Sequence, residues 1–332
     1  MKTIIRVHMK KTKQLRLLHI AAVLALTMAI MLVSCGKADA GGGSSSDGSS
    51  KGSASEVTDE KSGETAKPED SELYDQFEAN EAKALYRGKD GDRSGLLSLS
   101  SALEEGKSYT INQIIYLVQN SGPMPNKAEP ELEYERIDCG SDGIAELLTT
   151  MTMGSMRLYM ILKDIDGELV ICYAESASIS QNTPLAKIEV KINDDGTTSK
   201  IMDPGEGKVA FEEYSIIDAA GDYHLYYGLE TTTTFYADYY FTKDADNKIK
   251  ISPNGLDSEH IVLYEYYFSP DEHYMTYSMI DDDGKDVTTD ADYDDSNKVV
   301  QQFAREGVKI YTAKEIEDML SQRAKELNYP AD

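Results

Sequence analysis

Three acidic side chains stand at every fourth position in one loop of the sequence. Asp138, Asp142 and Glu146 occupy its first, fifth and ninth positions, and Gly143 provides a sharp bend. Carboxylate oxygens at such intervals are ligands that Ca²⁺ prefers, although Gly140 stands where a calcium loop usually has another oxygen ligand. The alternative is that both aspartates accept hydrogen bonds from the backbone of a tight turn. The sequence leaves a calcium site and a structural turn both open.

The same segment carries two resemblances. Its spacing resembles the D-x-D-x-D-G-x-x-[DE]-L loops of calcium-binding β proteins. Residues 134–148 also resemble a signature with the order aspartate-cysteine-glycine-x-aspartate-glycine in uncharacterised lipoproteins of gut Gram-positive bacteria, and this similarity extends over about residues 71–242. It implies a lipoprotein body of alternating strands and turns, with no established activity.

Tyrosines form a second group of candidate binding residues. Twelve of the 22 tyrosines lie between residues 214 and 277, including the pairs Tyr226-Tyr227, Tyr239-Tyr240 and Tyr266-Tyr267. Neighbouring residues of a strand point to opposite faces, so one tyrosine of each pair is expected in the core and the other outside. An outward row could bind a sugar or a peptide, and cross-strand aromatic packing is the alternative.

Evidence for catalysis is sparse. After residue 34 the chain has three histidines, His224, His260 and His273, and none has the spacing of a metal-ligand pair. Motifs for a nucleophilic serine, a phosphate-binding loop or a dinucleotide site are absent from the sequence. The eight aspartates of residues 281–295 are expected to form a solvated loop. A non-enzymatic role is therefore favoured, and a hydrolase without a recognised motif is the alternative.

Hydrophobic periodicity predicts the elements that position these residues. Helices are expected at residues 71–86, at residues 111–118 behind a Thr110 cap, and at residues 313–327 behind a Thr312–Glu315 capping box. From Glu131 the period changes to two, and hairpin-type dipeptides follow at 166–167, 195–196, 221–222, 246–247 and 283–284. The predicted fold class is α+β: an antiparallel β-rich meander with short N-terminal helices and a C-terminal helix packed on the sheet. Residues 71–332 are expected to form one domain, with two subdomains as an option.

The N-terminus resembles a bacterial lipoprotein precursor. Six basic residues precede an apolar segment, Ile20 to Val33, which ends at Leu32-Val33-Ser34-Cys35. The resemblance implies that residues 1–34 are a signal peptide, that Cys35 is acylated, and that the chain is held in the lipid bilayer on the extracytoplasmic side of the cell membrane. An uncleaved membrane helix and a start at Met9 are the alternatives.

Amino-acid composition and net charge indicate a tether after Cys35 and limit the classes of partner. Residues 36–70 are rich in serine and glycine and are expected to form a disordered tether. Removing residues 1–34 takes away six positive charges and no negative one, which changes the net charge from −26 to −32. Such a chain is repelled by nucleic acids, so none is expected as a partner. We expect a surface module for binding, scaffolding or sensing, with a peptide or glycan ligand; a calcium-stabilised surface module is the other non-enzymatic alternative.

Overall fold

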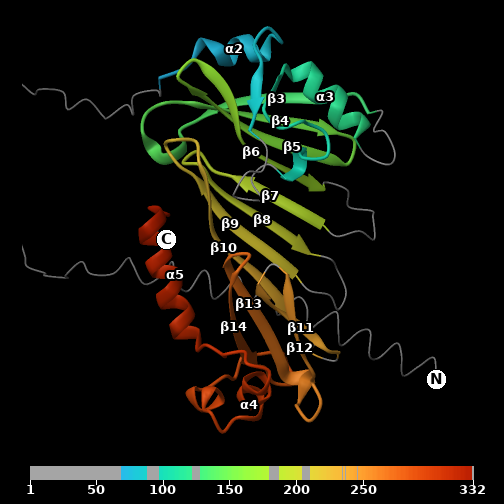
Figure 1. Cartoon of the computed structure of the whole chain (residues 1–332), viewed down its shortest axis with the longest axis vertical. Coiled ribbons are helices and arrows are strands. Elements are labelled where there is room, and N and C mark those ends of the chain that lie inside the picture. The colour runs from blue at the N-terminus through green and yellow to red at the C-terminus, as the bar shows by residue number, and fades with distance from the viewer. Residues whose placement is uncertain are drawn as a thin grey trace, which may run out of the picture. The chain divides into compact units, whose positions relative to one another are not determined.

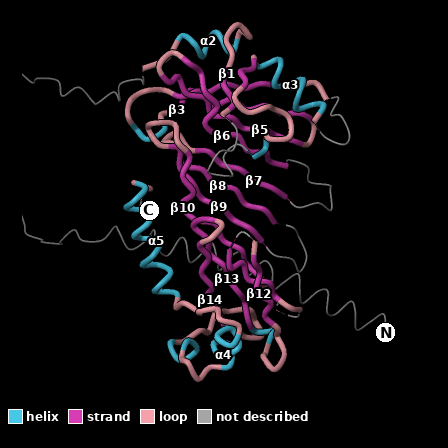
Figure 2. Tube along the Cα trace, viewed as in Figure 1, coloured by secondary structure: helices cyan, strands magenta, loops and turns pink. Residues whose placement is uncertain are grey.

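The computed structural model describes residues 69–87, 97–121, 128–178, 187–203, 210–233, 235, 237–244 and 246–330. These residues belong to one compact unit, which spans Pro68–Ala331. Strands dominate it, as Figure 2 shows, and short helices accompany them. The predicted α+β class is therefore confirmed. The predicted signal peptide, Cys35 and nearly all of the tether lie outside the described residues.

The first six-stranded sheet contains the acidic loop. Its spatial order is β2-β1-β6-β5-β4-β3, of which β6 to β3 are labelled in Figure 1, and all its pairs are antiparallel except β1 with β6. Helices α2 and α3 cover one face of this sheet and share its apolar core. The elements are α2 (Glu72–Glu78), β1 (Ala84–Tyr86), β2 (Lys107–Tyr109), α3 (Ile111–Asn120), β3 (Glu131–Ile137), β4 (Glu146–Met153), β5 (Met156–Ile165) and β6 (Glu168–Ser178).

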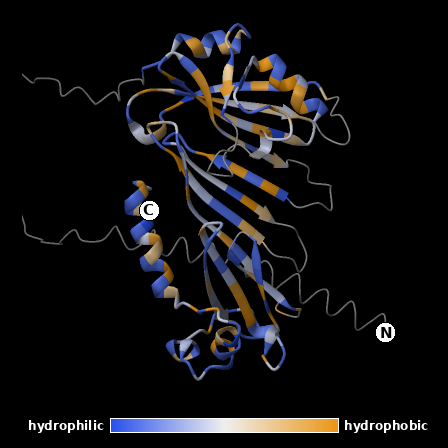
Figure 3. Ribbon diagram, viewed as in Figure 1, coloured by the Kyte–Doolittle hydropathy of each residue, from blue (hydrophilic) through white to orange (hydrophobic). Residues whose placement is uncertain are grey.

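The second six-stranded sheet is antiparallel throughout and has the order β14-β13-β10-β9-β8-β7. Its alternation of polar and apolar residues is visible along β7 in Figure 3. A separate hairpin of β11 and β12 shares an apolar core with this sheet and with α4. The elements are β7 (Lys187–Ile192), β8 (Thr197–Asp203), β9 (Ala210–Ile217), β10 (Tyr223–Thr232), β11 (Tyr239–Asp244), β12 (Asn247–Ile251), β13 (Ile261–Ser269), β14 (Glu272–Met279), α4 (Lys298–Arg305) and α5 (Ala313–Leu327).

The local sequence signals locate two helices and three turns correctly. Helix α3 begins after Thr110 and α5 after Thr312, as predicted, and the capping box expected at Thr312–Glu315 is present. A capping box of Thr110 with Gln113, which was not predicted, starts α3. The dipeptides at 166–167, 195–196 and 221–222 connect consecutive antiparallel strands. Helix α5 contacts β10 and β14, so the C-terminal helix packs on the sheet as predicted.

The predicted helix over residues 71–86 is wrong in its second half. Helix α2 ends at Glu78, and Asn80 then adopts a left-handed conformation with φ of 64°. Ala84 and Tyr86 are buried as alternate residues of β1, which pairs in parallel with β6. The partner strand lies more than 80 residues away in sequence, so local periodicity does not predict this pairing. Helix α4 was not predicted.

The folded unit also begins slightly before the predicted boundary at residue 71. The Glu69 N–H donates to the Gly143 carbonyl at 2.8 Å, and the Ala145 N–H donates to the Glu69 carbonyl at the same distance. The chain thus enters the fold directly beside the acidic loop. Among the described residues, no helix is both long enough and apolar enough to cross a membrane.

Candidate functional site

The two aspartates of the acidic loop bind the backbone of their own turn. Both carboxylate oxygens of Asp138 lie within 3.2 Å of the Gly143 N–H, and Asp142 Oδ1 accepts from the Ile144 N–H at 2.8 Å. These bonds fix the bend between β3 and β4. They are the contacts expected from the structural alternative.

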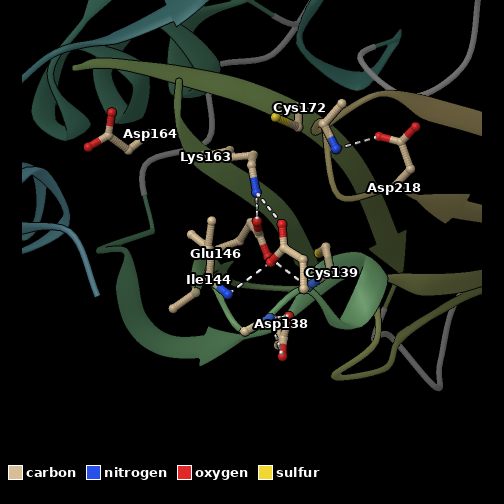
Figure 4. A network of polar contacts seen from close by, with 12 residues as sticks. Asp138, Cys139, Ile144, Glu146, Lys163, Asp164, Cys172 and Asp218 are labelled. Carbon is tan, nitrogen blue, oxygen red and sulfur yellow. Dashed lines mark hydrogen bonds and ion pairs between the residues drawn. The ribbon is translucent and has the colours of Figure 1, made fainter. Parts of the chain in front are cut away.

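Glu146, the third acidic residue, forms a buried ion pair. It opens β4 with no exposed surface, and its Oε2 accepts from the Cys139 N–H at 2.6 Å. Its Oε1 accepts from the ammonium of Lys163 on β5, which is only 6% exposed (Figure 4). Burial raises the pKa of the Glu146 carboxyl, whereas Lys163 and the Cys139 amide counteract this effect.

Lys163 keeps its charge inside this pair. Burial opposes the ammonium form, but the hydrogen bond and the negative charge of Glu146 outweigh burial and raise the pKa of Lys163. Asp142 Oδ2 adds a second carboxylate at 4.0 Å from the Lys163 Nζ. The lysine thus supplies the positive charge that a cation would bring to this loop.

These contacts do not favour a calcium ion at Asp138, Asp142 and Glu146. Both oxygens of Glu146 have protein donors, and the two aspartates hold backbone amides. Within the part of the chain that the structure describes, no group of three or more His, Cys, Asp or Glu side chains is arranged to hold a metal ion. The calcium site remains a prediction without support from these contacts.

The loop is also a joint between the two sheets. The Asp138 and Gly140 N–H groups donate to the carbonyls of Asp194 and Asp195, at 2.8 and 3.0 Å, in the turn between β7 and β8. Gly196 in that turn has φ of 83°, and a Cβ there would lie 2.9 Å from the Cβ of Cys139. Only glycine fits this conformation and this approach.

The two cysteines are buried free thiols at this joint. A Cβ at Gly221, in the turn between β9 and β10, would lie 2.8 Å from the Cys172 sulfur. Burial raises the pKa of both thiols, that of Cys172 to about 12. Both therefore stay protonated at neutral pH and are small packing groups rather than nucleophiles.

The tyrosine pairs follow the predicted split in one of three cases. Tyr239 is buried and Tyr240 is 54% exposed, as expected. Tyr226 and Tyr227 lie at a β-bulge, and their rings contact each other with centroids 4.9 Å apart. Tyr226 also stacks on Tyr329 beyond α5 and donates its hydroxyl to the Leu320 carbonyl of α5. Tyr226 and Tyr227 are therefore held by the C-terminal helix and by aromatic packing rather than free for a ligand.

The structure also gathers a polar cluster that sequence reasoning missed. Glu230 on β10 lies directly opposite Glu265 on β13. Glu265 is 2% exposed and accepts hydrogen bonds from the Tyr239 hydroxyl, the Thr242 N–H at 3.2 Å and His273 Nδ1 at 2.7 Å. The available signal was an acid at an inward position of an apolar strand, between Leu263 and Tyr267.

The second acidic segment, residues 281–295, forms turns rather than a cation site. Asp281 Oδ1 accepts from the N–H groups of Asp283 and Lys285, and Asp292 Oδ2 accepts from the Thr289 N–H and hydroxyl. Its carboxylates thus cap local backbone at the surface.

Each large sheet ends in a strand with one open side. β3 is one edge strand of the first sheet, with β2 at the opposite edge, and β7 is one edge strand of the second, with β14 at the opposite edge. Among the described residues, no strand pairs with the outer side of β3 or β7. The side chains of Glu131, Glu133 and Glu135 are exposed along β3, and alternate residues are exposed along β7.

Comparisons with known proteins add no assignment to this geometry. No family model matches it, and no curated protein and no solved structure matches it significantly.

Proposed function

We propose that this chain is a lipid-anchored, extracytoplasmic binding module without catalytic activity, and that it binds an extended polypeptide at an open sheet edge. The observation that carries the proposal is β3, a seven-residue edge strand with no partner strand on its outer side among the described residues. An exposed strand edge is a template for strand addition, in which backbone hydrogen bonds provide affinity.

The sequence supports the proposed lipid anchor and extracytoplasmic location. The segment that ends at Cys35 has the pattern of a lipoprotein signal, and two acyl chains on that cysteine give a stable anchor. The Ser- and Gly-rich residues 36–68 then precede the folded unit, which begins at Glu69. A Ser- and Gly-rich sequence of about 33 residues is typical of a flexible linker, whose average reach of roughly 30 Å is enough to hold a folded body away from the lipid headgroups.

The charges along β3 favour selective peptide binding at this edge over self-association of the chain. Three exposed glutamates alternate along β3, so a second copy of this acidic chain is repelled there. A peptide with basic or neutral polar side chains gains backbone hydrogen bonds without that repulsion. A peptide is favoured over a glycan because the sequence has no tryptophan for a sugar-stacking platform.

The internal pairing of reactive groups supports a non-enzymatic role. Glu146 binds Lys163, and the buried carboxylate Glu265 has Tyr239 and His273 as partners. A catalytic acid or base must reach a substrate within hydrogen-bond distance, and these groups are already held by the fold.

Site-specific photo-cross-linking on intact cells tests the proposal. A benzophenone amino acid at Glu133 is expected to capture a peptide or a protein segment, whereas the same group at Tyr116, which is 67% exposed on α3, is expected to capture none. Equal capture at both positions, or no adduct at Glu133 while the protein is present on the cell surface, would refute strand addition at β3.

A further inference from the structure

Two glutamates face each other across the middle of the second sheet. Glu230 of β10 and Glu265 of β13 are direct register partners in an antiparallel pair. Directly opposite residues on one sheet face have Cβ atoms about 5 Å apart, and like charges there destabilise the pair. Glu265 is nearly inaccessible to water, and Glu230 is only partly exposed.

The surroundings decide which carboxyl carries a proton. Glu265 receives three hydrogen bonds, from Tyr239 and Thr242 of β11 and from His273 of β14. Donors directed at a carboxylate stabilise its charged form, and these three hold the Glu265 carboxylate. Glu230 faces this carboxylate from a partly buried position, and burial together with the charge of Glu265 raises the pKa of Glu230.

The other charged and titratable groups around Glu230 leave this assignment unchanged. On β13, the half-buried Tyr267 donates its hydroxyl to Glu213 of β9 at 2.8 Å and adds no positive charge. Lys248 of β12 and His273 of β14 lower the pKa of Glu230, and so does the Tyr239 hydroxyl, but burial and the charge of Glu265 outweigh them. The net result is a Glu230 pKa of about 7.

The hairpin of β11 and β12 contacts the sheet through this pair. Tyr239 opens β11 and donates to Glu265, and the Thr242 backbone donates to the same carboxylate. Tyr239 is buried, and its hydroxyl interacts with both glutamates. When Glu230 loses its proton, a second negative charge therefore appears at the point where the hairpin is attached to the sheet.

We propose that Glu230 and Glu265 form a proton-binding site that fastens the β11–β12 hairpin to the second sheet and loosens it when the proton on Glu230 leaves. The ligand is a proton taken from the aqueous phase, and no covalent chemistry is involved. The sign follows from linkage: a carboxyl whose pKa is higher in the folded state stabilises that state at low pH. This contribution is complete below the ordinary glutamate value and is lost as the pH rises through about 7.

Hydrogen exchange measured by mass spectrometry tests the site on the full chain in a mild non-ionic detergent. After correction for the intrinsic pH dependence of exchange, protection of peptides covering residues 239–251 is expected to fall about tenfold between pH 6 and pH 8. Peptides from residues 146–165 provide an internal control and are expected to show no such fall. Glu230→Gln is expected to remove the pH dependence and to leave the hairpin better protected than in the wild type at pH 8.

Two further results distinguish the glutamate pair from a histidine sensor. His273→Gln is expected to retain the pH-dependent fall, because Glu230 and Glu265 remain. If the fall vanishes in His273→Gln but persists in Glu230→Gln, the histidine is the sensor and the proposal is overturned. If Glu230→Gln does not fold, NMR of ¹³C-glutamate-labelled wild-type protein decides, since the proposal requires one carboxyl that titrates near pH 7. Its absence overturns the proposal.

Discussion

Replacing Lys163 by methionine provides a stringent test of the buried joint. Methionine fills much of the same volume but leaves Glu146, which has no exposed surface, without its counter-charge. Removing one partner of a buried pair costs about 3–5 kcal/mol. Glu146 retains the Cys139 amide at 2.6 Å, so we expect the lower end, about 3 kcal/mol. For a domain of this size that corresponds to a fall in melting temperature of roughly 6–12 °C.

Thermal and urea unfolding of the purified chain at pH 7 measure this effect, with two controls. Lys187→Met breaks a surface pair with Glu189 in which both side chains are more than half exposed, and it is expected to cost at most about 1 kcal/mol. The double variant Lys163→Met, Glu146→Gln removes both charges and keeps an acceptor for the Cys139 amide, so it is expected to recover most of the loss. A single Lys163→Met variant as stable as Lys187→Met, or a double variant no better than the single one, would refute the buried ion pair.

Three further results are expected from unfolding experiments on the same preparation. Gly221→Ala should destabilise the chain by about 2 kcal/mol or more, because its Cβ meets a thiol sulfur at 2.8 Å, whereas Gly255→Ala, with a similar φ and open space, should cost only about 1 kcal/mol; equal losses would contradict the close approach. Tyr239→Phe should cost about 1.5–3 kcal/mol through the lost bond to Glu265, and Tyr240→Phe less than about 0.5 kcal/mol; a neutral Tyr239→Phe would contradict this anchoring role. Millimolar calcium should leave the melting temperature unchanged, since lysine already neutralises the acidic loop; a clear rise would restore the calcium hypothesis.

The sequence predicts the elements whose signals are local. The predicted caps at Thr110 and Thr312 mark two helix starts correctly, because a cap and its partner lie three residues apart. The change of period at Glu131 coincides with the first residue of β3. The hairpin dipeptides at 166–167, 195–196 and 221–222 correctly mark turns between neighbouring strands, since a tight turn depends on its own residues, whereas the one at 283–284 follows β14, the last strand.

Features that depend on distant pairing were not predictable in this way. β1 forms because its backbone pairs in parallel with β6. Its three residues are too few to show a strand periodicity of their own. The partner of Glu146 follows from the register of β4 on β5, and the opposition of Glu230 and Glu265 follows from the register of β10 on β13. Sequence spacing identified Glu146 as a candidate ligand, but it could not show that Lys163 reaches the same carboxylate.

The proposed lipid anchor is tested most directly by the intact mass of the protein extracted from cell membranes. We expect the mass of residues 35–332 increased by a diacylglyceryl group, with or without a further acyl chain, and loss of this species in a Cys35→Ser variant. A membrane-bound protein that retains residues 1–34 and carries no lipid would contradict the anchor and, with it, the proposed role at the cell surface.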